Sequence, residues 1–109
     1  MTITSNEIIL VGSKLNEVRI GFNQVYYFKS DGNYTHLYTE NGRFTELISI
    51  KSLLTRLPAH PFTRIHKSYV VNKNKVSDFT LNTVNLGKYE IPVGKTFNSE
   101  LNSFFANAG

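Results

Sequence analysis

Cysteine is absent from this sequence of 109 residues. Without thiols the chain can form neither a disulfide nor a thiolate metal site, and this fits a reducing compartment such as the cytoplasm. It also lacks an apolar leader and any run of about 18 apolar residues, so we expect no membrane span. Because 40% of the residues are hydrophobic, the chain can build one core of ordinary size. We therefore expect a single soluble, cytoplasmic domain, residues 1–109.

Motifs for small-molecule chemistry are scarce as well. Gly87 and Gly94 each stand alone among polar neighbours, so no phosphate-binding glycine loop is present. The three histidines lack the spacing and the neighbouring carboxylates of a zinc site. Ser68, His66 and Asp78 have the residue types of a Ser-His-Asp catalytic triad. However, neighbouring positions of a strand point to opposite faces, and the sequence has no nucleophile elbow. We expect no catalytic site, no metal and no cofactor.

Positive charge is concentrated in the second half of the chain. Up to Leu54 five basic residues balance five acidic ones, whereas from Thr55 onward seven basic residues stand against three acidic. The densest stretch is FTRIHKSYVVNKNKV, residues 62–76, where basic residues are interleaved with Ile, Tyr and Val. A polyanionic partner would contact this half. The alternative is a basic face that is merely solvated.

The chain shows mostly the pattern of β-strands. We predict strands at 7–11, 15–20, 24–30, 33–39, 64–71, 76–81, 83–86 and 88–91. Asp31-Gly32 and Asn41-Gly42 predict tight hairpin turns, and the second would place Glu40 opposite Arg43. Alternation within 33–39 assigns Tyr34, His36 and Tyr38 to one face and Thr35, Leu37 and Thr39 to the other.

Two amphipathic segments interrupt the strands. Ser49 can cap a helix whose apolar side chains recur from Ile50 to Leu57, and Pro58 would end it. A second apolar stripe runs over 97–105 after Gly94, with Thr96 as its cap. The sequence thus predicts a mainly β fold with one or two short helices.

The basic stretch does not suit one straight strand. Alternation would put Arg64 and His66 on the same side as Phe62, which mixes charge with apolar bulk. We therefore predict that the chain turns at His66-Lys67-Ser68 and presents Lys67 and Ser68 on a tip. An amine and a hydroxyl on a tip suit phosphate oxygens and base edges.

This stretch resembles the central motif of the LytTR domain, the DNA-binding domain of LytR/AlgR-type bacterial response regulators. VYYFKSDGNYTHLYT resembles the family's upstream strand pair, and YEIPVGKTFNSEL resembles its closing Pro-Val segment. The resemblance covers residues 8–105. It implies an elongated domain of stacked antiparallel β-sheets that inserts loops, rather than a recognition helix, into successive DNA major grooves.

The resemblance also implies three DNA-contacting sites. The residues that it marks are Asn33, Thr35 and His36 after the Asp-Gly turn; Lys67, with Ser68 and Arg64 as phosphate partners; and Lys95 with Thr96 after the Pro-Val segment. Lys73 and Lys75 can add phosphate contacts or be solvated lysines. Lys67 can read a guanine or only bind a phosphate. His66 is expected to pack beneath the tip.

The partners that the resemblance implies are double-stranded DNA, bound as paired direct repeats by two protomers, and an upstream receiver or other signalling domain. No receiver-like segment with acidic phosphoacceptor residues is found in this chain. The expected function is that of the output domain of a transcriptional response regulator in a two-component system. The alternative is a β-rich protein-interaction or scaffold domain with a solvated basic face. The salt dependence of DNA binding separates the two.

Overall fold

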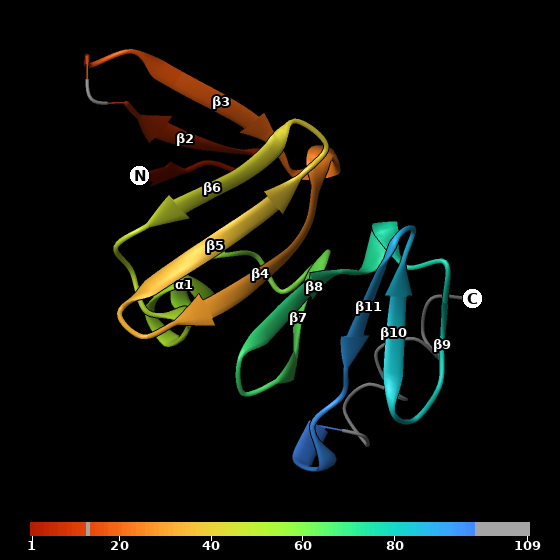
Figure 1. Cartoon of the computed structure of the whole chain (residues 1–109). Coiled ribbons are helices and arrows are strands. Elements are labelled where there is room, and N and C mark those ends of the chain that lie inside the picture. The colour runs from red at the N-terminus through yellow and green to blue at the C-terminus, as the bar shows by residue number, and fades with distance from the viewer. Residues whose placement is uncertain (13, 98–109) are drawn as a thin grey trace.

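The structure is a computed structural model that describes residues 1–12 and 14–97. Within these residues the chain forms three antiparallel sheets, which stand side by side in Figure 1. The five-stranded sheet lies in the middle, with a three-stranded sheet on either side of it. The molecule measures 43 × 28 × 25 Å along its principal axes. The predicted mainly β, elongated fold of stacked antiparallel sheets is therefore confirmed.

The strands follow one another through the three sheets with few crossovers. The N-terminal sheet has the order β1 (Thr2–Ile3), β2 (Glu7–Val11), β3 (Glu17–Gly21). The central sheet has the order β6 (Gly42–Glu46), β5 (Tyr34–Thr39), β4 (Val25–Asp31), β8 (Tyr69–Asn72), β7 (Phe62–His66). The C-terminal sheet has the order β11 (Tyr89–Pro92), β10 (Thr83–Leu86), β9 (Asp78–Phe79). The 3-10 turns η1 (Phe22–Gln24), η2 (Lys73–Lys75) and η3 (Lys95–Phe97) join or follow these strands.

One α-helix, α1 (Ile50–Arg56), lies within the described part of the chain. Its predicted cap is confirmed, because the Ser49 hydroxyl accepts a hydrogen bond from the Ser52 amide at 3.1 Å. Ile50 and Leu53 are buried in the core, as the apolar stripe predicted. The second predicted helix lies outside the described residues from position 98 onward. No helix in residues 1–12 and 14–97 is long and apolar enough to cross a membrane.

The hairpin between β5 and β6 differs from the prediction by one residue. Thr39 pairs with Gly42, so Glu40 and Asn41 form the turn and Gly42 follows it with a φ of 117°. The predicted pair of Glu40 with Arg43 is therefore wrong. The Glu40 carboxylate instead accepts from the Lys75 ammonium at 2.5 Å.

Two other predicted strands are shorter in the structure. Strand β3 begins at Glu17 because the chain turns before it, with the Gly12 amide bonded to the Asn16 carbonyl at 2.8 Å. The predicted strand 76–81 is reduced to β9.

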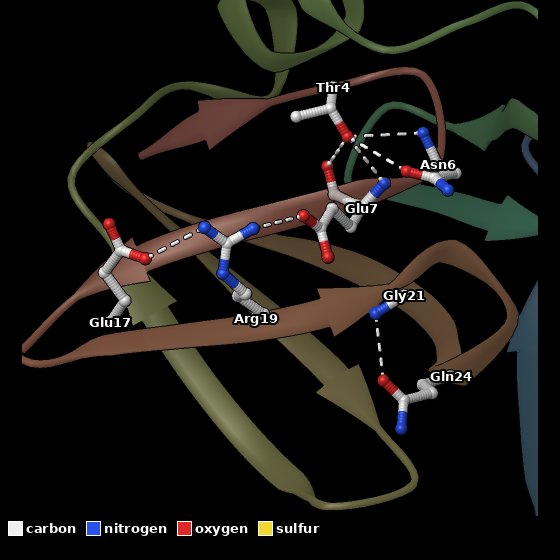
Figure 2. Close-up of polar contacts among 7 residues, drawn as sticks. All are labelled: Thr4, Asn6, Glu7, Glu17, Arg19, Gly21 and Gln24. Carbon is white, nitrogen blue, oxygen red and sulfur yellow. Dashed lines mark hydrogen bonds and ion pairs between the residues drawn. The ribbon is translucent and has the colours of Figure 1, made fainter.

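On the N-terminal sheet, the Arg19 guanidinium forms ion pairs with the carboxylates of Glu7 at 2.6 Å and Glu17 at 3.1 Å (Figure 2). This ion-pair network covers the solvent side of β2 and β3.

Two apolar clusters lie on opposite faces of the central sheet. The first joins this sheet to α1 and the N-terminal sheet and includes Ile8, Phe28, Leu37, Leu53 and Val70. The second joins it to the C-terminal sheet and includes Tyr27, Ile65, Val71, Val84, Leu86 and Ile91. The central sheet is thus covered on both faces and serves as a rigid support for its connecting turns.

A group of tyrosines fills part of the second cluster. The ring of Tyr27 stacks on that of Tyr38, with centroids 4.3 Å apart, and meets the edge of Tyr89 at 5.1 Å. Burial raises the pKa of the Tyr27 phenol well above its usual value, and the neighbouring Tyr38, Tyr89 and Tyr69 raise it further. The phenol is therefore neutral over the whole physiological pH range.

Asn72 is the buried polar residue that ties the two halves of the central sheet together. Its side chain has 0% exposure, and its amide nitrogen donates to the carbonyls of Phe22 at 2.9 Å and Val25 at 2.8 Å. Its side-chain oxygen accepts from the Asn74 amide at 2.9 Å. These bonds fix the end of β8 against the beginning of β4.

Replacement of this residue tests that assignment. Asn72→Ala should lower the free energy of unfolding by about 1–3 kcal/mol, because two buried carbonyls lose their donor. Urea denaturation followed by circular dichroism measures the change. The matched control is Asn23→Ala at an exposed position, which should stay within about 0.5 kcal/mol of the wild type. Equal stability of the two variants would contradict the assigned role of Asn72.

Candidate nucleic-acid interface

Three connecting segments gather along one side of the molecule, the lower side in Figure 1. They are the β4–β5 turn (31–34), the β7–β8 turn (67–68) and the segment 94–97 that leads from β11 into η3. The Ser30 amide donates to the Ser68 carbonyl at 2.9 Å, which links the first two. The Gly94 amide donates to the Ile65 carbonyl at 2.8 Å, which links the last two. The three predicted contact segments thus form one edge, named here the turn edge.

The β7–β8 turn presents the side chain of Lys67. Tyr69 pairs with His66, so Lys67 and Ser68 form a two-residue tip as predicted. Lys67 is exposed and Ser68 is half-buried. The Ser68 amide donates to His66 Nδ1 at 3.1 Å, so His66 supports the tip from behind, again as predicted. Among the described residues Lys67 has no ion-pair partner.

Arg64 lies behind the same turn and binds its backbone. Its Nε donates to the His66 carbonyl at 3.2 Å and its Nη2 donates to the Lys67 carbonyl at 2.5 Å. The guanidinium carbon lies 5.9 Å from the centroid of the Phe97 ring. Two donors of the predicted phosphate contact are therefore already used within the protein.

The β4–β5 turn presents Asn33, which is exposed. The side chain of His36, only 14% exposed, supports this turn. Its Nε2 lies 2.9 Å from an Asp31 carboxylate oxygen and its Nδ1 lies 2.7 Å from the Thr45 hydroxyl. The carboxylate can only accept, so Nε2 donates to it when the imidazole is neutral and Nδ1 accepts from Thr45. Both ring nitrogens of His36 are thus bonded within the protein.

Thr35 corrects the prediction for this site. Its side chain has 0% exposure, and its hydroxyl donates to the Ile48 carbonyl at 2.7 Å. Strand alternation places Thr35 on the same face as Leu37, toward the first apolar cluster. Thr35 is therefore a structural residue and is not part of the surface.

Lys95 and Thr96 are both exposed in η3. Gly94 joins this segment to β7, and a side chain there would crowd the Phe97 ring. A Cβ atom on Gly94 would lie 3.4 Å from the His66 Cα and 3.0 Å from the Phe97 ring. Gly94 thus lies where the third predicted site meets the second.

Lys73 does not belong to this group. It lies in η2, at the end of β8 away from Lys67, where its amide donates to the Pro61 carbonyl at 2.8 Å. Lys75 is at the same far end, and Lys88 lies in the β10–β11 turn, also on the upper side in Figure 1. The basic second half of the sequence is therefore divided between two ends of the molecule. Lys73 lies outside the turn edge, and its DNA contact stays a prediction.

One basic residue near the turn edge was missed by sequence reasoning. Lys29 on β4 pairs with Tyr69 on β8, and its ammonium lies 5.9 Å from the Tyr69 ring centroid. It thus stands directly behind the Lys67 tip. The signal that could have found it is the pairing of β4 with β8, which joins segments far apart in the sequence.

Metal binding and pocket-based chemistry find little support in the described part of the chain. In residues 1–12 and 14–97 no group of three or more His, Asp or Glu side chains could hold a metal ion. An open pocket of about 410 Å³ lies at the other end of the molecule, lined in part by Asn6, Asn23, Pro61 and Asn74. Its lining contains no basic side chain. The turn edge is therefore the candidate functional site.

Comparison with known proteins gives consistent matches. The family model described as the LytTr DNA-binding domain matches residues 16–106. An uncharacterized response regulatory protein of Vibrio cholerae serotype O1 is 30% identical over 99 residues. That match covers 82% of this chain but only 38% of the relative's length. The solved structure of a LytTr DNA-binding domain from Bacillus cereus superposes with a TM-score of 0.78 at 20% identity, covering 94% of this chain and 98% of that one.

A pair of threonine variants separates structural from surface roles on this edge. Thr35→Val should lower the free energy of unfolding by about 1 kcal/mol, because the Ile48 carbonyl loses its donor, and should leave DNA affinity within about twofold. Thr96→Val should do the reverse, leaving stability unchanged and weakening DNA binding. Chemical denaturation and fluorescence anisotropy measure the two effects. A loss of DNA affinity in folded Thr35→Val would restore Thr35 to the site.

Proposed function

Because this chain belongs to the LytTR DNA-binding domain family, we propose that it binds double-stranded DNA sequence-specifically, as the output domain of a bacterial transcriptional response regulator. The observation that carries the proposal is the turn edge, where three connecting segments present exposed polar side chains together. The chain spans 38% of the length of its curated relative, an uncharacterized response regulatory protein, and we propose that its signal input comes from an upstream receiver or other signalling domain.

The charge of the turn edge suits a phosphate backbone. Lys29, Lys67 and Lys95 lie at or directly behind its three segments. The acidic residue of these segments within the described residues is Asp31, and its carboxylate is bonded to His36. The edge therefore carries net positive charge, which draws the domain to DNA and orients it.

The exposed side chains of the turns suit the major groove. Turns that project from a covered sheet can enter a groove about 12 Å wide. Asn33 can form paired hydrogen bonds with adenine, and Lys67 can donate to guanine O6 and N7. Lys95 and Thr96 add a third contact. Ser68 and Lys29 are half-buried beside these exposed side chains and are proposed to contact phosphates.

Two protomers on paired direct repeats would extend this contact along the duplex. A repeat spacing of about one helical turn places both turn edges on the same side of the DNA. DNA as the partner of a bacterial regulator also fits the cytoplasmic location inferred from the sequence. The alternative, a scaffold domain with a solvated basic face, requires no sequence preference and no ordered turn edge.

Selection from randomised duplexes, read by sequencing and by fluorescence anisotropy at several salt concentrations, tests the proposal. A short motif should be enriched, as two copies about one helical turn apart. If about four phosphates are neutralised, log affinity should fall with log salt at a slope near −4. Weak binding that is equal on all duplexes would reject specific DNA recognition and favour the scaffold function.

Lys67→Ala tests the base contact of the tip. Because the Lys67 side chain is exposed at the end of its turn, we expect it to read a guanine, and its loss should relax the preference at one base pair by about 1–3 kcal/mol. The matched control is Lys88→Ala, an exposed lysine in a turn at the opposite end, which should change neither affinity nor preference. Equal weakening on all sequences would show that Lys67 binds only a phosphate.

A further inference from the structure

The Lys67–Ser68 turn lacks the backbone geometry that two-residue hairpins favour. Such turns match the twist of their strands when a central residue has a positive φ, as glycine readily does. Gly32 and Gly87 supply positive φ values of 59° and 61° in the β4–β5 and β10–β11 turns. Neither Lys67 nor Ser68 has a positive φ. The register of β7 and β8 also shifts between Arg64 and His66. This turn therefore needs support from outside its own backbone.

Side chains supply that support. The Arg64 guanidinium holds two successive carbonyls of the turn, those of His66 and Lys67. The Ser68 amide is held by the His66 ring, and the Ser68 carbonyl by the Ser30 amide. The two bonds of Arg64 are the ones in this set that come from a charged donor, which strengthens a hydrogen bond.

Arg64 also reaches the neighbouring segment. Its guanidinium lies against the Phe97 ring, at the distance of a cation–π contact. Gly94, at the start of the same segment, donates to the Ile65 carbonyl, next to Arg64 in sequence. The Arg64 side chain thus contacts the backbone of the Lys67–Ser68 turn and also the Phe97 ring of η3.

We propose that Arg64 is a positioning residue that locks the Lys67–Ser68 turn and η3 into one recognition unit, and that it is not a phosphate contact. A planar guanidinium presents its donors in a rigid fork and a flat face to a ring, whereas an ammonium is a compact charge without that fixed geometry. Sequence preference then depends on Arg64 through Lys67, Lys95 and Thr96, although Arg64 itself touches no base. The effect of Arg64 on sequence preference rests on the proposed DNA binding. Its effect on the order of the turn rests on the fold alone.

Arg64→Lys tests the proposal, because it retains the charge and removes the fork. The ratio of affinity for the selected site to affinity for a scrambled duplex should fall about tenfold or more. Affinity for the scrambled duplex and the salt slope should stay as in the wild type. Amide hydrogen exchange at Ser68 and Gly94 should become faster, with exchange at Leu37 unchanged. The matched control is Arg43→Lys on β6, an exposed arginine of the same sheet, which should change none of these quantities.

A phosphate contact gives the opposite pattern. Arg64→Lys would then keep the affinity ratio and the exchange rates, and Arg64→Ala would reduce the salt slope by about one. That result would overturn the proposal. Thermal unfolding verifies that each variant is folded.

A second variant keeps the test decisive if Arg64→Lys fails to fold. Gly94→Ala leaves all charges in place but crowds the Phe97 ring, which would lie 3.0 Å from the added Cβ and which carries the Arg64 contact. It should lower the same affinity ratio while the salt slope is kept, and an unchanged ratio would overturn the coupling of the two segments. If the wild type enriches no DNA motif, the proposed function fails by itself. The exchange rates at Ser68 and Gly94 in Arg64→Lys then decide the positioning role alone.

Discussion

The antiparallel pairing of β4 with β8 is the contact on which the turn edge depends. It joins a local three-stranded meander, β4 to β6, to a hairpin that follows α1. At one end of this pairing the buried Asn72 side chain binds two carbonyls at the beginning of the β4 segment. At the other end the Ser30 amide binds the Ser68 carbonyl. The position of the β4–β5 turn relative to the β7–β8 turn follows from this register.

Sequence patterns were most informative where structure is local. The Ser49 cap and the tip at Lys67 were predicted from neighbouring residues, and both are confirmed. The first hairpin turn was predicted one residue too early, because Asp31 pairs with Tyr34 and the turn is Gly32-Asn33. The predicted Glu40–Arg43 pair was wrong. The Asn41-Gly42 dipeptide indicates a tight turn but does not determine whether Gly42 lies in the turn or begins the next strand. In the strand predicted at 76–81, the residues that pair with β10 in the ladder are Asp78 and Phe79, and β9 is correspondingly short.

The predicted contact residues were marked by their positions along the chain, and the structure shows where each of them lies. Family resemblance marks positions but does not give the side on which each side chain lies. Thr35 is one residue from His36, yet it faces the core, as alternation in the same strand already indicated. Lys73 is close to Lys67 in sequence, but a strand of four residues separates them in space. Lys29 was missed because its neighbour on β8 is distant in sequence.

The division of labour along the turn edge has a consequence for protein engineering. The side chains that hold the turns, such as Arg64, His66 and His36, are bonded within the protein, whereas Asn33, Lys67 and Lys95 project from them. Exchanging the projecting residues leaves the supporting bonds untouched. A combinatorial library restricted to these three positions is therefore a compact starting point for retargeting the domain to new operators on an unchanged β scaffold.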